Sequence, residues 1–251
     1  MTAVAFAEDR AGPAGERAVA LDPGPVLRLA VVIPTLNAAA TLGAVLDQVL
    51  AESAGLDLDV VVADGGSSDA TVAVAAACGA RVVRAPRGRG PQLAAGAAAV
   101  RGDWLLFLHA DTVPAPGWAA AVTAFAQTAP AGRAAYFRFG LDDPAPAARR
   151  LERRVAWRCR TFGLPYGDQG LLIARADYDR LGGFRPLPLM EDVDLVRRIG
   201  RRRLAALPVA ATTSAARYRR EGYRMRSIRN LTCLTLYLLG LPPRLIARLY
   251  G

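Results

Sequence analysis

The amino-acid sequence predicts an α/β fold with a mostly parallel sheet covered by helices on both faces, and three observations lead to this class. The length of 251 residues suits one substantial domain with a well-buried core. The apolar fraction of 53% is that of a globular protein. Short continuous apolar runs alternate with longer segments at helical spacing, a pattern typical of strands buried on both faces.

The first elements follow from the opening half of the chain. The run LRLAVVIPTLN predicts a buried strand that begins at Leu27, and residues 38–52 carry apolar side chains at helical spacing. A second strand is expected over residues 59–63. It ends in DGGSSD, where Ser68 or Asp69 is expected to cap the next helix.

The same alternation continues further along the chain. RVVRAP is followed by a GRG loop and an alanine-rich helix, and WLLFLHAD by a helix from about Pro116. Ligands of such sheets bind beyond the carboxyl ends of the strands, where Asp64 and Asp111 are expected to lie. After about Arg133 the pattern changes to a strand-like AAYFRFG, an arginine-rich helix and the loop GLPYGDQG. We expect this second half to build the other side of the site.

The two ends of the chain differ from the centre. Residues 1–26 lack the basic start and apolar stretch of a secretory signal and predict a flexible leader, followed by a main domain over residues 27–222. Residues 223–251 predict a helical segment, whose uninterrupted apolar part, residues 231–241, is too short for the roughly 20 residues of a membrane span. Packing against the domain, a homodimer contact and a helix lying on an anionic membrane remain open.

Charge and cysteine usage restrict the cellular setting. Cys78, Cys159 and Cys233 lie far apart without a CxxC pair, which predicts a reducing compartment without a structural disulfide. We therefore expect a cytoplasmic protein, either free or peripheral at the inner face of the membrane. The formal charge is +10 and all 32 basic residues are arginine, whose donor fork suits a diphosphate, an anionic membrane or nucleic acid.

Several function classes do not fit these residues. The absence of lysine excludes Schiff-base chemistry, and the chain lacks the signature of a phosphate-binding P-loop. The first strand is followed by PTLN, which is neither the GxGxxG of a dinucleotide enzyme nor the lysine-bearing loop of a nucleotidylyltransferase. No aromatic-plus-basic motif is present, so we expect no nucleic-acid partner.

Four acidic residues, in three segments, carry the candidate chemistry. Asp64, beside two glycines, can accept a hydrogen bond from a nucleobase or a ribose, although Asp-Gly-Gly is also an ordinary turn. Asp111, after the most hydrophobic strand, suits Mg²⁺ or Mn²⁺, which take few protein carboxylates besides phosphate oxygens. Glu191 and Asp192 open a predicted helix, where acids complement the helix dipole and one can also project into a cleft and deprotonate a hydroxyl.

Two further features concern anions and histidine. RGRGPQLAAGAA places Arg87 and Arg89 at the start of a helix, an arrangement that suits an anion. His109 is the only histidine of the chain, and both a structural role and a role as a ligand remain open.

Taken in order, six segments closely resemble the family 2 glycosyltransferases: VVIPTLN, DGGSSDAT, GRGPQLAAGA, LHADT, GDQG and MEDVDLVRR. They extend from roughly Leu29 to Arg220. The similarity is strongest to a bacterial subgroup with LHADT and GDQG, some of whose members are labelled arsenosugar-biosynthesis glycosyltransferases. The resemblance implies a GT-A fold, which is Rossmann-like, with a helical C-terminal extension.

The resemblance also implies residue roles. Asp192 matches the catalytic base of the family, and Glu191 lies beside it. Asp111 matches the final acid of the metal motif, in which His109 replaces the first acid. Asp64 would bind the nucleobase of the donor, most often uracil. Arg219 and Arg220 either grip the diphosphate or are solvated at the surface. The implied nucleotide-sugar site comprises Pro34, Thr35, Asn37, Asp64, Arg89, Gln92, His109, Asp168, Gln169, Arg219 and Arg220.

The implied activity is an inverting transfer of a sugar from a nucleoside-diphosphate sugar, with UDP favoured, to an unknown acceptor. The implied cofactor is Mg²⁺ or Mn²⁺. The alternative is a protein that binds a nucleotide sugar or a nucleic acid without transferring anything.

Overall fold

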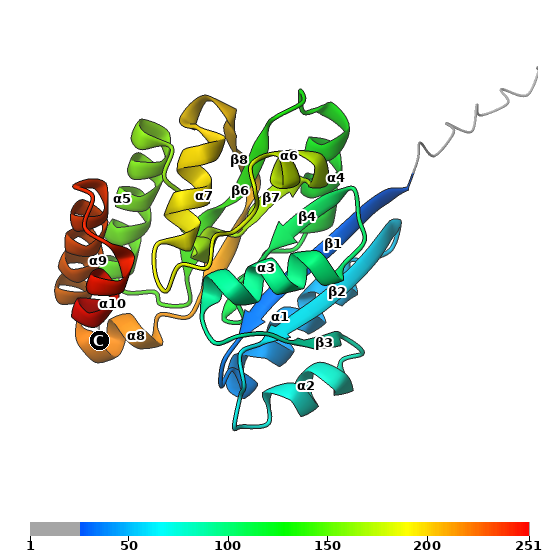
Figure 1. The fold of residues 1–251 in the computed structure, drawn as a ribbon, viewed down its shortest axis with the longest axis horizontal. Helices are drawn as coiled ribbons and strands as arrows, with labels where there is room; N and C mark the ends of the chain where they lie inside the picture. Colours follow the sequence, from blue (N-terminus) through cyan, green and yellow to red (C-terminus); the bar gives the residue numbers. More distant parts are fainter. Residues whose placement is uncertain (1–25, 251) are drawn as a thin grey trace, which may run out of the picture.

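In the computed structural model, which describes residues 26–250, eight strands form one sheet flanked by helices (Figure 1). The strand order is β3-β2-β1-β4-β7-β6-β8-β5. The strands are β1 (Leu27–Thr35), β2 (Leu56–Asp64), β3 (Arg81–Arg84), β4 (Trp104–Phe107), β5 (Thr112–Pro114), β6 (Ala134–Leu141), β7 (Leu171–Ala174) and β8 (Leu204–Thr213). The expected leader, residues 1–26, lies outside the described part of the chain except for Val26.

The sheet is parallel in its first half and mixed in its second. β1 pairs in parallel with β2 and β4, and β2 pairs in parallel with β3. β7 is antiparallel to both β4 and β6, β6 is parallel to β8, and β5 is antiparallel to β8. The predicted parallel βα alternation is therefore confirmed up to β4, and the antiparallel pairings begin where the sequence pattern changes.

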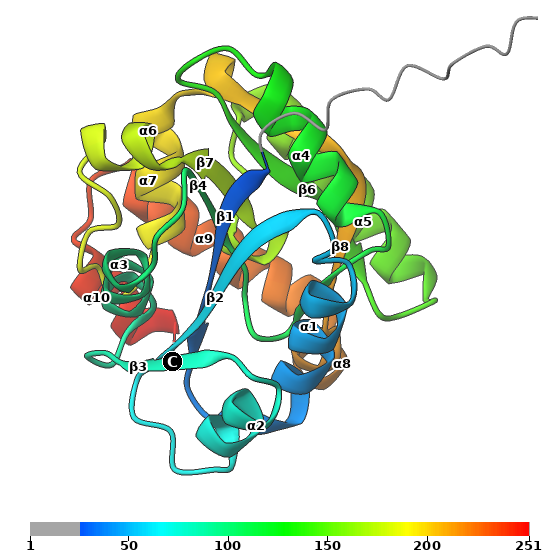
Figure 2. The same ribbon diagram turned by 90° about the vertical axis from the view of Figure 1, so that its right-hand side faces the viewer.

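Helices cover both faces of the sheet (Figure 2). One face packs against α1 (Ala39–Ala51), α2 (Thr71–Ala77) and α4 (Trp118–Thr128). The other packs against α3 (Arg89–Ala99), α6 (Arg175–Arg180) and α7 (Glu191–Ile199). The remaining helices are α5 (Pro146–Phe162), which packs on β6, α8 (Ala216–Glu221), α9 (Tyr223–Leu238), α10 (Pro243–Tyr250), and the 3-10 turns η1 (Gly167–Gln169) and η2 (Arg201–Arg203).

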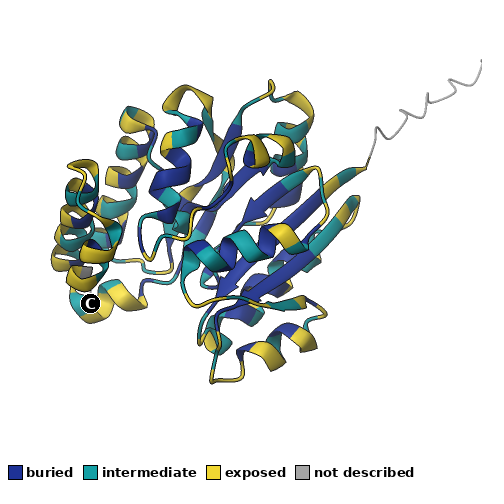
Figure 3. Ribbon diagram, viewed as in Figure 1, coloured by how far each residue is buried: buried dark blue, intermediate teal, exposed yellow. Residues whose placement is uncertain are grey.

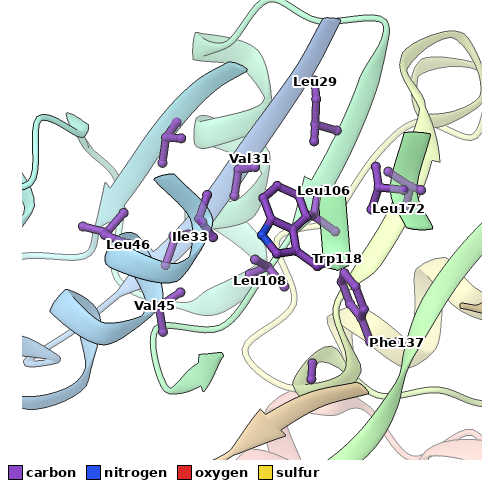
Figure 4. Packing of buried hydrophobic residues seen from close by; sticks show 14 of the residues in the cluster. Leu29, Val31, Ile33, Val45, Leu46, Leu106, Leu108, Trp118, Phe137 and Leu172 are labelled. Atoms are coloured by element: carbon purple, nitrogen blue, oxygen red, sulfur yellow. The ribbon is translucent and has the colours of Figure 1, made fainter. Parts of the chain in front are cut away.

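The alternation of side chains along β1 explains why both faces are apolar. Leu29, Val31 and Ile33 face α1 and α4, whereas Ala30 and Val32 face α3. Figure 4 shows the first of these layers, with the Trp118 ring among the strand side chains. The central strands are buried over most of their length (Figure 3), as expected for a sheet covered on both sides.

Two local expectations have different outcomes. Neither Ser68 nor Asp69 is the N-cap of α2, because that position is Ala70 and no side chain caps it. The Asp69 carboxylate instead accepts the backbone N–H of Thr71 and of Ala39, so it ties the starts of α1 and α2 together. The predicted C-terminal helical segment is present as α9 and α10. No helix among residues 26–250 has the length and apolarity that crossing a membrane requires.

Candidate active site

A pair of adjoining cavities lies beyond the carboxyl ends of β1 and β4, where the fold class predicts a ligand. One, here called the acid cavity, measures about 120 Å³ and is lined by Asp111, Asp168 and Asp192 among others. The other, here called the β1 cleft, measures about 460 Å³ and is lined by Pro34 and Asn37 among others. Both cavities share five residues, which are Arg89, His109, Asp111, Ser214 and Arg217.

Asp192 enters the acid cavity from the first turn of α7. Its Oδ2 accepts the backbone N–H of Gly167 at 2.7 Å, and its Oδ1 accepts the N–H of Val193 at 2.7 Å. A Cβ at position 167 would collide with the His109 ring, so glycine is required for the η1 turn to lie this close. The backbone of η1 therefore holds the Asp192 carboxylate in one orientation.

Asp168 is the most unusual acid of the cavity. Its Oδ1 is buried and has no hydrogen-bond partner among the described residues. Burial raises the pKa of the Asp168 carboxyl to about 6; Arg158 opposes the rise, and the nearby Asp192 and Asp111 add to it. A carboxylate in this setting gains from any positive charge that enters the cavity.

His109 lies between the two cavities. Its ring is surrounded by protein on most sides, although part of the residue remains exposed at the cavity wall. Burial lowers the pKa of His109 to about 4, helped by Arg89 and opposed by Asp111 and Asp192. The imidazole is therefore neutral near neutral pH, and it can accept or donate a hydrogen bond without adding charge.

In the β1 cleft, the ends of β1 and β2 form a fixed wall. Asn37 has a left-handed backbone with φ of 53°, and its Oδ1 accepts the N–H of Ser68 at 2.9 Å. Behind it, Asp64 accepts the Thr35 hydroxyl at 3.1 Å and the N–H groups of Gly66 and Ser67 at 3.0 and 2.9 Å. Only 3% of Asp64 is exposed.

These bonds change how Asp64 is understood. Burial alone would raise the pKa of its carboxyl, but the hydrogen bonds from Ser67, Gly66 and Thr35 outweigh burial and lower it. Its oxygens are occupied by the protein itself, and the structure does not place it among the residues that line the β1 cleft. In this arrangement Asp64 shapes the wall of the cleft, and a direct bond to a base remains a prediction.

The residues present fit a hard divalent cation held jointly with a ligand. Within residues 26–250 no group of three or more His, Cys, Asp or Glu side chains is arranged to hold a metal ion alone. Mg²⁺ and similar ions are bound by one or two carboxylates plus substrate phosphates, and Asp111 stands where the two cavities meet. In the same cavity the buried Oδ1 of Asp168 has no hydrogen-bond partner among the described residues, so this oxygen is available to a ligand or a cation.

Other predicted residues lie inside the protein. Gln92 donates from Nε2 to the backbone oxygens of Thr35 and Ala63, and it joins the ends of β1 and β2. Gln169 bridges η1, α5 and β6 through Tyr166, Arg158, Cys159 and Phe137. Glu191 is buried and forms an ion pair with Arg89, whose Nε lies 3.1 Å from Glu191 Oε1. Gln92, Gln169 and Glu191 are not among the residues that line the acid cavity or the β1 cleft.

The two predicted diphosphate arginines also point elsewhere. Arg219 lies 3.5 Å from Asp142 and 3.7 Å from Asp143, and Arg220 lies 3.2 Å from Glu221. Neither is among the residues that line the two cavities, whereas Arg217, from the same RYRREG segment, lines both.

Comparison with known proteins identifies the family of the chain. The family model described as "Glycosyl transferase family 2" matches residues 30–182, more than half of the chain. The chain belongs to this family. In this family 2 glycosyltransferase, the matched region contains Pro34, Asn37 and Asp111, which line the cavities at and beyond the ends of β1 and β4.

Two curated relatives of this glycosyltransferase are known from mycobacteria. A glucosyl-3-phosphoglycerate synthase of Mycolicibacterium paratuberculosis is 35% identical over 94 residues, 34% of this chain and 29% of that protein. A PGL/p-HBAD biosynthesis glycosyltransferase of Mycobacterium bovis is 38% identical over 88 residues, 32% of this chain and 34% of that protein. The matched part thus spans about a third of the length of these relatives.

A solved structure of glucosyl-3-phosphoglycerate synthase from Mycobacterium tuberculosis shares the fold of this glycosyltransferase. Its TM-score is 0.57 at 20% identity, covering 86% of this chain and 80% of that one. That crystal contains Mn²⁺, UDP and phosphoglyceric acid. The predicted GT-A fold is therefore confirmed.

Sequence reasoning missed part of the site of this glycosyltransferase. Tyr166, Arg217, Tyr218, Arg226 and Asn230 all line the acid cavity, yet none was among the predicted residues. A usable signal existed for one pair, because Arg226 and Asn230 are four residues apart and share a face of the predicted C-terminal helix. The sequence leaves open whether this helix packs against the domain, a second copy or a membrane, so its polar face is not assigned to the site.

Proposed function

We propose that this family 2 glycosyltransferase moves a sugar from a nucleoside-diphosphate sugar, with UDP favoured, to a hydroxyl of an acceptor, and that it inverts the anomeric configuration. One observation carries the proposal. Asp111 and Asp192 line the same cavity, and that cavity adjoins the β1 cleft at Asp111. A candidate metal-binding acid and a candidate catalytic base thus face one space.

The donor half of the proposal rests on the β1 cleft and the arginines beside it. Pro34 and Asn37 would contact the nucleoside, while Arg89 and Arg217 at the junction would bind the diphosphate. Breaking the sugar–phosphate bond leaves negative charge on the diphosphate, which these guanidinium groups stabilise. Asp111 would hold Mg²⁺ or Mn²⁺, which supplies further neutralisation of the same charge when bound.

The acceptor half rests on Asp192. Its carboxylate is oriented by the Gly167 N–H, so its free lone pairs can accept the proton of an incoming hydroxyl. The oxygen then attacks the anomeric carbon from the side opposite the diphosphate, and a single displacement inverts the configuration. The identity of the acceptor, including the arsenosugar label, stays a prediction, and the curated relatives carry names with two different products.

Substitution of Asp192 by Asn tests the proposal. We expect Asp192→Asn to bind UDP and Mn²⁺ as the unchanged protein does, measured as a rise in melting temperature, because a ligand of the folded state stabilises it. UDP release from a panel of UDP-sugars should fall about 100-fold or more, as for the loss of a general base. Asp57→Asn, at an exposed position near the start of β2, is the matched control.

The outcomes separate the alternatives. Unchanged turnover in Asp192→Asn would remove Asp192 as the base. An unchanged protein that binds UDP-sugars with Mn²⁺ but releases UDP from none of them would favour the binding-protein alternative.

A further inference from the structure

Helix α9 has one face that turns toward the protein. Arg226, Asn230, Cys233 and Tyr237 recur at intervals of three or four residues and therefore share a side of the helix. Arg226 and Asn230 line the acid cavity, and Cys233 belongs to a small core with Leu189 of the loop before α7. This face fixes the position of the helix.

The opposite face of α9 is exposed and carries five large apolar side chains. At 100° per residue, Met225, Ile228, Leu231, Leu238 and Leu239 fall within an arc of about 140°. Their exposed fractions reach 67% for Met225, 62% for Leu231 and 78% for Leu239. Arg224, Thr232 and Thr235 are exposed within the same arc, so this side of the helix is amphipathic. Single exposed leucines need no explanation, but five large apolar side chains on one side of a helix indicate an interaction surface.

Helix α10 packs beside α9 through Ile246 and Cys233, and it adds further exposed apolar residues and charge. Leu245 and Leu249 are exposed one turn apart, and Arg244 and Arg248 precede them at the same spacing. Residues 223–250 contain five arginines and no aspartate or glutamate. Arg226 and Arg229 pair with Glu221 of α8, so the exposed arginines of these helices are Arg224, Arg244 and Arg248. Figure 3 shows much of the outer surface of α9 and α10 as exposed. We call these exposed apolar residues and arginines of the two helices the α9–α10 face.

Helix α5, which contacts α9, carries a similar combination. Trp157 and Phe162 are each about half exposed and pack edge to face with their ring centroids 5.3 Å apart. Arg150, Arg153 and Arg154 surround Trp157 in a shallow surface groove. Tryptophan beside arginine is the combination that favours the headgroup region of a bilayer, where the ring is amphipathic and the guanidinium meets phosphate.

We propose that the α9–α10 face binds the surface of an anionic bilayer. The apolar stripe would enter the boundary between headgroups and acyl chains, and the arginines would contact the lipid phosphates. The helices would lie in the plane of the surface, since none in the described chain can cross it. A second copy of the chain fits this face less well, because the segment would oppose arginine to arginine without an acid of its own.

Flotation with lipid vesicles tests the proposal and needs neither donor nor acceptor, so its result is independent of the transferase reaction. We expect the full chain to float with vesicles of phosphatidylcholine containing phosphatidylglycerol, and to bind pure phosphatidylcholine much more weakly. Binding should weaken as salt is raised, because the charges lie at the surface. The double variant Ile228→Glu with Leu231→Glu should lose about tenfold or more in vesicle affinity, because two inserted apolar side chains are replaced by acids.

Two controls keep the result interpretable. Val72→Glu places the same acid on α2, at another exposed apolar position, and should leave vesicle binding unchanged. Leu239→Glu tests the far end of the stripe separately, and circular dichroism checks that each variant is folded. The proposal is overturned if the unchanged chain does not float with the anionic vesicles, or if the double variant floats equally well. A homodimer that the double variant dissociates, without vesicle binding, overturns it as well and assigns the face to self-association.

Discussion

Replacing the buried carboxyl of Glu191 should make the stability of the folded protein less sensitive to rising pH. Glu191 is 1% exposed, and the Nε of its partner Arg89, whose side chain is partly exposed, lies 3.1 Å from Glu191 Oε1. Burial raises the pKa of the Glu191 carboxyl from its ordinary 4.5 to about 7, while Arg89 limits the rise and Asp192 adds to it. The folded protein therefore holds a proton at Glu191 that the unfolded chain releases.

The sign and the size of the effect follow from this difference. Between about pH 4.5 and 7 the folded state binds more protons than the unfolded state, so stability falls as pH rises. A pKa raised from 4.5 to about 7 corresponds to about 3 kcal/mol, fully present below pH 4.5 and lost by the time pH passes 7. Glu191→Gln keeps the shape of the side chain and removes this term.

Urea unfolding at several pH values measures the effect. The stability of Glu191→Gln relative to the unchanged protein should increase by about 3 kcal/mol from about pH 4.5 to about 7.5. All other titrating groups are shared by the two chains and cancel in the difference. Asp57→Asn serves as the surface control, with an expected change within about 0.5 kcal/mol. Parallel stability curves for Glu191→Gln and the unchanged protein would show that Glu191 is ionised at no cost, and the reasoning would fail.

Two further predictions concern the arginines and the close approach of α3 to the sheet. Arg217→Ala should lower kcat/KM for the donor about tenfold or more, whereas Arg219→Ala should change it less than about twofold, and equal losses would contradict the assignment. Gly96→Ala should destabilise by about 1–3 kcal/mol in thermal or urea unfolding, because the added Cβ collides with Val32. Gly43→Ala is its control, since a Cβ there meets only Val74 Cγ1 at 3.7 Å.

The sequence was most informative where one local pattern decides one element. β1 begins at Leu27 as predicted, because a β-branched run fixes a strand without help from distant residues. The cap of α2 could not be assigned in this way. The Asp69 carboxylate is shared between Thr71 at the start of α2 and Ala39, 30 residues earlier, and no local rule includes the second contact.

The candidate site shows the same division. Asp111 and Asp192 were predicted from motifs and lie in one cavity. Arg217 was missed in favour of Arg219 and Arg220, because which of three closely spaced arginines points inward depends on how α8 begins after β8. Arg226 reaches the cavity only because α9 packs back against the domain, which its sequence alone left open.

The backbone supplies an argument for the site that does not depend on any carboxylate. Among residues 26–250 only two residues other than glycine have a positive φ, Asn37 at 53° and Met190 at 66°. Asn37 lines the β1 cleft and Met190 lines the acid cavity.

Asparagine tolerates this conformation, but for methionine it costs about 1–2 kcal/mol. The fold tolerates that cost at Met190 because the preceding Leu189 is buried against α9 and α10, and the bend delivers Asp192 into the cavity two residues later. Strain retained at such a position is expected where geometry serves binding or catalysis, and it favours the two cavities as one working site.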